Sequence, residues 1–150
     1  MTSIQHEDGY KDKVHLDSEN DTFLVENEPL SGIFDIIYGY EKVAYWQKSY
    51  KAYWCIRNNK LFLQKITGSL NSEPISLKKF AKDINVESNK LGVFASWYSN
   101  DFKILRKIDP IYNEESDPIN DVITYLVMTV EKGIVVDVTE TQEQKMHLPF

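Results

Sequence analysis

The chain has a single cysteine, Cys55, among its 150 residues, which excludes an internal disulfide. Its 6 glycines and 5 prolines are too few for a collagenous or low-complexity protein. No apolar run approaches the roughly 20 residues that cross a bilayer, and the first 21 residues lack the basic and apolar regions of a signal peptide. These absences lead us to expect a cytoplasmic protein.

The usual sequence motifs of catalysis and phosphate binding are also missing. No GxGxxG, P-loop, GxSxG or HExxH pattern occurs. Cys55 has only Arg57 as a charged neighbour in sequence, so we interpret it as a structural strand cysteine rather than a nucleophile. His6, His15 and His147 lack the spacing of zinc ligands. We therefore predict a protein that is not an enzyme and holds no metal or cofactor.

An acidic stretch near the N-terminus partly matches a calcium-binding loop. Asp17, Glu19, Asp21 and Glu28 occupy positions 1, 3, 5 and 12 of that template. Position 6, which requires glycine, is Thr22, and no helix is predicted on either side. We interpret the stretch as a solvated acidic segment.

The length and composition fit one folded domain. The chain is 42% hydrophobic and 13% aromatic, and a chain of this length can bury roughly 70% of its unfolded surface. Residues 1–22 are polar and show no period of 2 or 3.6, so we expect an acidic, mobile N-terminal arm. We place the globular domain at residues 23–139 and expect a frayed tail at residues 140–150.

The net charge of −6 is unevenly distributed. Residues 1–30 contain eight acidic residues and two lysines, and residues 108–150 contain nine acidic residues and two lysines. Residues 38–107 contain thirteen basic residues and five acidic ones. Acidic ends of this kind attract a basic partner, unless they fold over the basic middle and cancel its field.

The clearest structural signal is a β-hairpin. Tyr50, Ala52, Trp54 and Ile56 alternate with other residues in period 2, which predicts a strand with one buried face. Asn58 and Asn59 tolerate the positive φ of a tight turn, and the apolar run 61–63 resumes the β pattern.

Further elements follow this hairpin. Ser76 precedes apolar residues at helical spacing from Leu77 to Ile84, which predicts a capped helix. Two more hairpins are predicted, one joining residues 93–98 to 102–106 and the other joining 125–130 to 134–138. Residues 33–38 fit either a strand or a helix. The predicted fold class is α+β, mainly an antiparallel sheet of successive hairpins with at least one packed helix at about residues 76–85.

Aromatic and basic residues are interleaved in the middle of the chain. Seven aromatic residues accompany four basic ones: Tyr38, Tyr40, Tyr45, Trp46, Tyr50, Tyr53 and Trp54, with Lys42, Lys48, Lys51 and Arg57. Single-stranded nucleic acid is bound by such sets, in which bases stack on the rings. The alternation instead favours a core face that buries Tyr50 and Trp54. Exposed members of the set could equally anchor a protein partner.

Three segments carry a family resemblance. They are "YKAYWCIRNNKLFLQKITG" (50–68), "VFASWYSNDFKIL" (93–105) and "LVMTVEKGIVV" (126–136). Together they resemble a group of small uncharacterised bacterial proteins with the pattern W/Y-x-A-x-W-x-I, K-L-x-L, F-A-x-W and E-K-G-x-V-V. Small acidic bacterial proteins of this kind are often regarded as immunity proteins that neutralise a toxin, so the resemblance implies such a role here.

The predicted function is a protein-binding module, an immunity-type protein that neutralises a toxin by direct occlusion. A basic toxin is the expected partner, and neither a nucleic acid nor a membrane is expected. We predict that Asp17, Glu19 and Asp21 steer the partner and that Tyr45 and Trp46 anchor it. A nucleic-acid or small-ligand binding domain that uses the basic, aromatic middle is the alternative.

Overall fold

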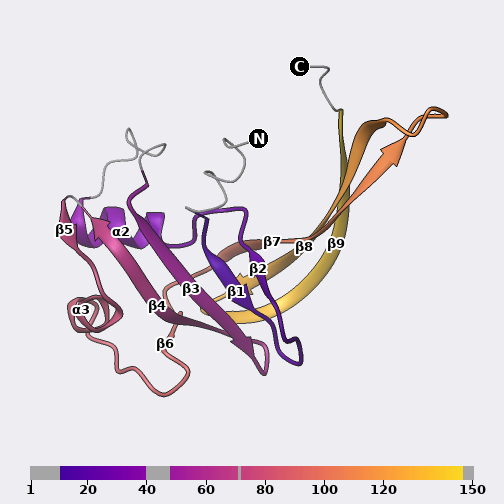
Figure 1. Ribbon diagram of the computed structural model, residues 1–150. Helices are drawn as coiled ribbons and strands as arrows, with labels where there is room; N and C mark the ends of the chain where they lie inside the picture. The colour runs from indigo at the N-terminus through magenta and orange to yellow at the C-terminus, as the bar shows by residue number, and fades with distance from the viewer. Residues whose placement is uncertain (1–10, 40–47, 71, 147–150) are drawn as a thin grey trace.

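The computed structural model describes residues 11–39, 48–70 and 72–146. Its elements are β1 (Lys13–His15), β2 (Thr22–Leu24), α2 (Ser31–Tyr38), β3 (Tyr50–Arg57), β4 (Lys60–Leu70), β5 (Glu73–Pro74), α3 (Leu77–Asp83), β6 (Val93–Phe94), β7 (Asn100–Tyr112), β8 (Pro118–Glu131) and β9 (Ile134–Met146). The short helices α2 and α3 lie beside a large, curved sheet (Figure 1). The predicted β-rich, mainly antiparallel structure is confirmed.

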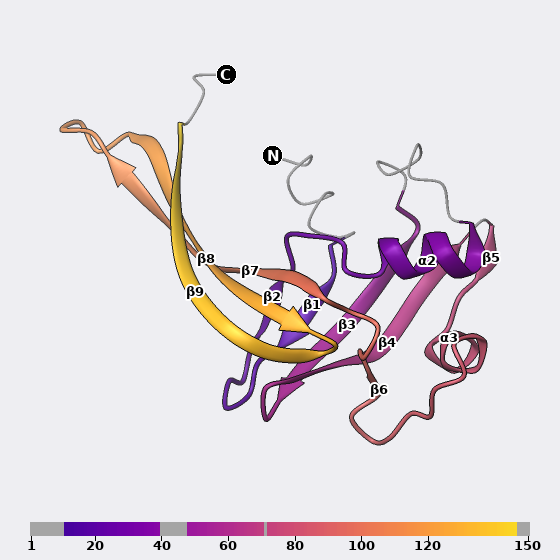
Figure 2. The ribbon, with the colours of Figure 1, turned by 180° about the vertical axis from the view of Figure 1, so that it is seen from behind.

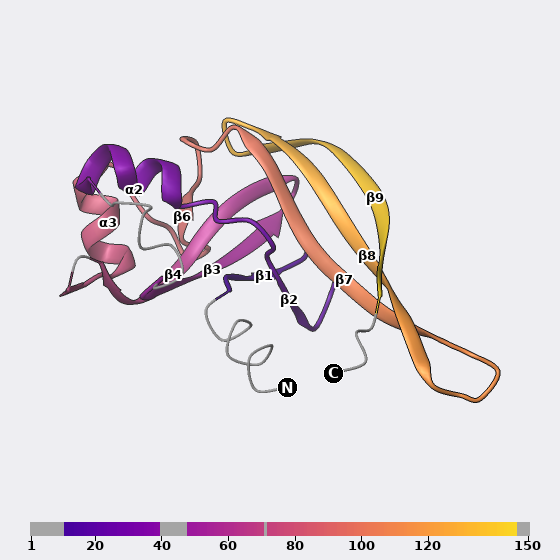
Figure 3. The same ribbon diagram turned by 90° about the horizontal axis from the view of Figure 1, so that it is seen from above.

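The strands form one sheet in the order β2-β1-β3-β4-β9-β8-β7, and β5 and β6 also pair with β4. Only β1 and β3 are parallel among the described neighbours. The two ends of this order meet, because Val25 forms a bridge with Ile104 and the N–H of Glu26 donates to the carbonyl of Lys103 at 2.8 Å. The sheet therefore curls until its edges touch (Figure 3).

The core lies inside this curl. Trp54 on β3 and Phe102 on β7 are fully buried and meet edge to face at 5.7 Å between ring centroids. The helices cover one end of the sheet and are held by Phe34 of α2 and Phe80 of α3, whose rings lie 5.6 Å apart. Aromatic pairs of this geometry add to the hydrophobic stabilisation of the core.

The β3–β4 hairpin and α3 agree with their sequence signals. Asn58 and Asn59 have φ values of 52° and 61°, and Arg57 pairs with Lys60. The Ser76 hydroxyl accepts the N–H of Lys79 at 3.2 Å, as expected of an N-cap. Residues 33–38, which fitted either a strand or a helix in the sequence, lie in the helix α2.

The hairpin predicted for residues 93–106 is wrong. β6 pairs with β4 rather than with β7, and Leu63 lies opposite Val93. The rings of Phe62 and Phe94 lie 5.7 Å apart on this pair. The turn after Ala95 then redirects the chain, with the N–H of Tyr98 donating to the carbonyl of Ala95 at 3.0 Å.

Both ends of the described chain differ from the expected boundaries. Within the predicted arm 1–22, residues 1–10 lie outside the described residues, but Asp12, Val14 and Leu16 are buried and β1 pairs with β3. At the other end, β9 continues to Met146 instead of fraying after residue 139. Pairing with β8 supplies its backbone hydrogen bonds, so no apolar pattern is required.

Candidate functional site

A three-stranded β-ribbon projects from the folded body. We define the ribbon as residues 107–123 of β7, β8 and their connection, together with residues 143–146 of β9. β7 and β8 stay paired along the ribbon, from Ile108 opposite Ile123 to Tyr112 opposite Pro118. Figures 1 and 2 show that the ribbon extends away from the helices, at the opposite end of the molecule.

The tip of the ribbon is an ordered turn at residues 113–117. The Oδ1 atom of Asn113 accepts the N–H of Glu115 at 2.8 Å and the N–H of Asp117 at 3.0 Å. The N–H of Asn113 donates to the carbonyl of Asp117 at 2.9 Å, and Ser116 has a positive φ of 65°. These bonds fix the turn that carries the acidic side chains of the tip.

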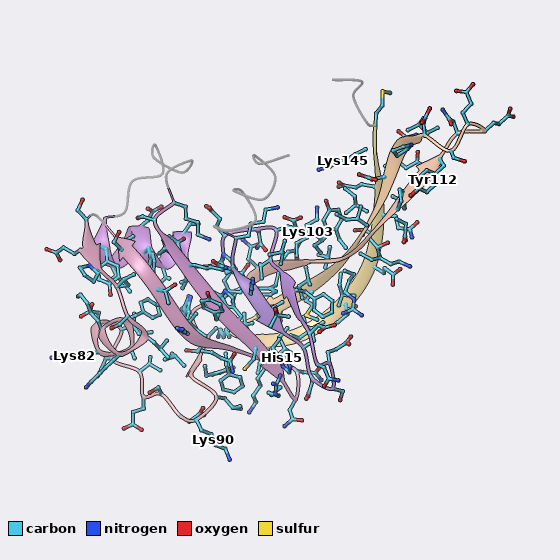
Figure 4. The ribbon with its side chains drawn as sticks, in the orientation of Figure 1. His15, Lys82, Lys90, Lys103, Tyr112 and Lys145 are labelled. Atoms are coloured by element: carbon cyan, nitrogen blue, oxygen red, sulfur yellow. The ribbon has the colours of Figure 1, made fainter. Side chains whose placement is uncertain are left out.

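Large apolar side chains are exposed on the ribbon. Ile108, Tyr112 and Met146 are 52%, 57% and 75% exposed, and Ile119 is also exposed. Figure 4 shows Tyr112 near the outer end of the ribbon, far from Lys82 and Lys90 at the α3 end. Exposed apolar groups that gather on one element are typical of interaction surfaces.

The same ribbon is strongly acidic. It carries six carboxylates and two lysines: Asp109, Glu114, Glu115, Asp117, Asp121 and Glu143, with Lys107 and Lys145. Lys107 is itself paired with Asp109 at 3.5 Å. The ribbon therefore combines apolar contacts with a negative field.

At the base of the ribbon, Lys103 joins Tyr125 and Glu143. Its Nζ atom lies 4.1 Å from the ring centroid of Tyr125 and 3.7 Å from the Oε1 atom of Glu143. Burial raises the pKa of Tyr125, and the carboxylates of Glu26 and Glu143 raise it further. A shallow groove of about 570 Å³ runs beside these residues.

A second hollow, of about 480 Å³, lies between α2 and the connection from β6 to β7. Glu28 is the only carboxylate among the described residues that line it, and Asn27 and Asn100 supply amide groups. Trp97 also lines the hollow, and its buried Nε1 atom has no hydrogen-bond partner among the described residues. This lining offers polar contacts but no pair of carboxylates for acid–base chemistry.

The predicted steering residues lie around the turn between β1 and β2. The Oδ2 atom of Asp17 accepts the N–H of Asn58 at 3.2 Å, and Glu19 lies 3.0 Å from the Nη2 atom of Arg106. Asp21 is exposed. Asp17 and Glu19 are therefore already engaged within the chain. The predicted anchors Tyr45 and Trp46 lie outside the described residues.

The basic, aromatic middle separates into buried and exposed parts. Tyr50 and Trp54 are buried, as the alternation predicted, and Lys48 is buried with them.

On the outer face, the Nζ atoms of Lys51 and Lys65 lie 5.5 Å and 5.4 Å from the ring centroid of Tyr53. Lys13 on β1 is in register with Tyr53. These four residues, Lys13, Lys51, Tyr53 and Lys65, are named the Tyr53 cluster below.

Cys55 and His15 are the cysteine and the histidine that the structure describes. Cys55 is fully buried, and this burial raises the pKa of its thiol, although Arg57 acts in the opposite direction. The Nδ1 atom of His15 accepts a hydrogen bond of 2.7 Å from the Nη2 atom of Arg57. Within residues 11–39, 48–70 and 72–146, no three His, Cys, Asp or Glu side chains group closely enough to hold a metal ion. The partial calcium template does not form such a group.

Neither the family models, nor the curated proteins, nor the solved structures include a match to this chain. In the part of the chain that the structure describes, no helix has the length and apolar character needed to span a membrane.

Proposed function

We propose that this protein is a protein-binding module that docks on a basic partner through the ribbon and acts by direct occlusion. The observation that carries this proposal is the exposure of Ile108 and Tyr112, four residues apart on one face of β7, on an acidic element that lies outside the core. An immunity-type role, in which the partner is a toxin, is the narrower form of the proposal. In that form the ribbon covers the working surface of the toxin without any chemistry of its own.

The energetics support a few apolar anchors aided by charge. Burial of a large apolar side chain contributes roughly 1.5–3 kcal/mol, so Ile108 and Tyr112 together contribute roughly 3–6 kcal/mol. Association costs about 4–15 kcal/mol of translational and rotational freedom. Apolar contacts alone therefore give a modest affinity. The six carboxylates of the ribbon would add specificity and a faster encounter with a basic surface.

The experiment compares the partners that three forms of the tagged chain retain. The ribbon variant combines Ile108→Ser with Tyr112→Ser. The control is Ile36→Ser, because Ile36 on α2 is also exposed and lies at the other end of the molecule. We expect a basic protein that is retained by the wild type and by the control but lost by the ribbon variant. Retention of every captured protein by all three forms would contradict docking through the ribbon.

The narrower toxin hypothesis has its own test. The captured protein is expressed alone and then with each form of the chain. We expect it to arrest growth when expressed alone, and we expect rescue by the wild type and by the Ile36→Ser control but not by the ribbon variant. A captured protein that is harmless alone would leave the binding proposal standing and exclude the immunity role.

The Tyr53 cluster favours a second candidate, a nucleic-acid binding function. Lys51 and Lys65 lie over the Tyr53 ring, and Lys13 is opposite Tyr53 on the neighbouring strand, so the cluster can neutralise phosphates and stack a base. The test is oligonucleotide binding measured at several salt concentrations, with the double variant Lys51→Ala and Lys65→Ala. Under the first proposal we expect no binding at about 0.15 M salt. Micromolar binding that is lost in the double variant would favour this candidate instead.

A further inference from the structure

The outer edge of β9 is open from Asp137 to Met146. β9 contacts β4 only at its start, where Lys60 lies opposite Ile134 and the N–H of Val135 donates to Asn59. Beyond that point the described residues pair with β9 only on its β8 side. Figure 3 shows β9 at the outside of the molecule, with no other described element along its free side. Such an edge presents unpaired backbone N–H and C=O groups.

The two free edges of the ribbon differ in their protection against strand pairing. The outer edge of β7 contains Pro110 and has a bulge at Arg106, where the register with β8 shifts between Leu105 and Lys107. Proline and bulges are devices that prevent edge-to-edge pairing. β9 has no proline, and its register with β8 is uninterrupted from Asp137 to Met146. β9 is therefore the edge that can accept another strand.

The sequence of β9 is complementary to itself when two copies run antiparallel with Thr141 on the twofold axis. In that register Asp137 of each copy lies opposite Lys145 of the other. Thr139 then faces Glu143, Glu140 faces Gln142, and Val138 faces Gln144. No two like charges are opposed, and oppositely charged cross-strand pairs stabilise a sheet.

Neighbouring registers in which both copies of β9 turn the same face to the same side of the sheet are less favourable. If the axis moves to Glu140, that residue faces its own copy and Asp137 faces Glu143, so carboxylates are opposed. If the axis moves to Gln142, Lys145 faces Thr139 and both ion pairs are lost. Registers shifted by one residue would set side chains of opposite faces beside each other, which a twofold axis perpendicular to the sheet does not allow.

We propose that two copies of this chain associate through the free edges of β9, antiparallel and centred on Thr141, to form one continuous sheet. This is an isologous contact, which closes as a dimer and does not propagate. The contact uses the backbone edge of β9, whereas Ile108 and Tyr112 of the ribbon lie on β7. The test of the dimer requires no partner protein, so its failure is distinguishable from failure of the proposed function.

The first test is sedimentation of the full chain across a range of concentrations, at about 0.15 M salt so that repulsion between the acidic chains is screened. We expect the mass to rise from 17.5 kDa toward twice that value. Thr141→Lys places two ammonium groups opposite each other at the axis and should weaken the dimer by about tenfold or more. Thr139→Lys is the matched control, because its ammonium would face Glu143 and the dimer should persist.

Charge exchange and cross-linking test the register directly. Asp137→Lys alone should weaken the dimer, and the double variant Asp137→Lys with Lys145→Asp should restore it. Thr141→Cys should give a disulfide-linked dimer under mild oxidation, because the two cysteines are directly opposed. Thr139→Cys should not, since its copies lie four residues apart. Cys55 is buried, so the wild type should remain unlinked.

A wild type that sediments as a monomer at about 1 mM overturns the proposal. Equal dimerisation of Thr141→Lys and Thr139→Lys overturns it too, as does equal cross-linking of the two cysteine variants. Circular dichroism of each variant should match the wild type, because all the changed side chains are exposed.

Discussion

The ammonium group of Lys48 lies 2.7 Å from the Oδ1 atom of Asp12 inside the protein, where these side chains are 8% and 1% exposed. The same carboxylate accepts the backbone N–H of Ala52 at 3.0 Å and the indole N–H of Trp54 at 3.1 Å. One carboxylate therefore joins the segment before β1 to β3. It also satisfies three buried donors at once, which a buried charge requires.

Removal of this carboxylate should destabilise the fold. We expect Asp12→Ala to lower the free energy of unfolding by about 3–5 kcal/mol, because it leaves the charge of Lys48 buried without its partner. Lys107→Ala is the control, since Lys107 and Asp109 form an exposed ion pair that gains little in water. Urea denaturation measures both variants. Similar losses of unfolding free energy in the two variants would show that the buried ion pair stabilises the fold no more than the exposed one.

Truncation of the central tryptophan tests the core. Trp54→Ala should cost about 3–5 kcal/mol, because it leaves a cavity beside Phe102 and removes a donor to Asp12. Tyr112→Ala should cost far less, since Tyr112 is exposed on the ribbon. Equilibrium unfolding followed by circular dichroism gives both values. A loss below about 1 kcal/mol for Trp54→Ala would contradict its place in the core.

Alkaline pH should destabilise the protein through its buried tyrosines. Burial raises the pKa of Tyr98 from 10.0 to about 12, with the carboxylate of Asp101 adding to the effect and the hydrogen bond from Asn27 opposing it. A pKa raised in the folded state gives stability that is complete below pH 10 and is lost as the pH rises toward 12. Unfolding free energies measured across this range should therefore fall.

The variant Tyr98→Phe isolates the contribution of this residue. At neutral pH it should cost about 1–3 kcal/mol, because Asn27 and the carbonyl of Asp101 lose their partner. Above pH 10 its stability should fall less steeply than that of the wild type. An unchanged alkaline slope would exclude Tyr98 as a source of the loss, leaving Tyr38 and Tyr125, whose pKa values are also raised.

Cys55 should be unreactive in the folded protein. Its thiol is fully buried and its pKa is raised, so little thiolate is present or accessible at neutral pH. A disulfide reagent should therefore modify Cys55 slowly in buffer and rapidly in denaturant, which absorbance measures. Reaction at the same rate in both conditions would contradict the burial of β3.

Charge at the tip of the ribbon should control association with the partner. Replacement of Glu114, Glu115 and Asp117 by amides should slow association at low salt and have less effect at high salt, because long-range attraction is screened. Ile108→Ser should mainly speed dissociation. The comparison set is Asp17, Glu19 and Asp21, of which two are already engaged by the chain. If neutralising this set slows association more than neutralising the tip does, the N-terminal segment rather than the ribbon attracts the partner.

The sequence predicted the elements that have one buried face. Tyr50, Ala52, Trp54 and Ile56 alternate because β3 turns these side chains toward the core, and all four are buried. Val14 and Leu16 show the same alternation with period 2. Two apolar residues among charged ones are too few to predict a strand. Their burial depends on the parallel pairing of β1 with β3, which is a long-range relationship.

The ribbon could not be predicted in the same way. The end of β9, residues 139–146, shows no apolar alternation because both of its faces are exposed. Its structure depends on backbone pairing with β8, and hydrophobic periodicity does not encode that pairing. The acidic residues of this region were recognised, but the sequence offered no evidence that they share a projecting element with Ile108 and Tyr112.

The seam between Val25 and Ile104 also has a consequence for biosynthesis. The ribosome makes the N-terminal strands first, yet β1 has no neighbour on one side until β3 emerges, and the segment after β2 has no bridge until Ile104 emerges. The nascent chain therefore carries an unfinished sheet through most of its synthesis, and unpaired strands in that state are prone to aggregation. The time that translation takes from residue 25 to residue 104 therefore sets how long this segment stays without its bridge.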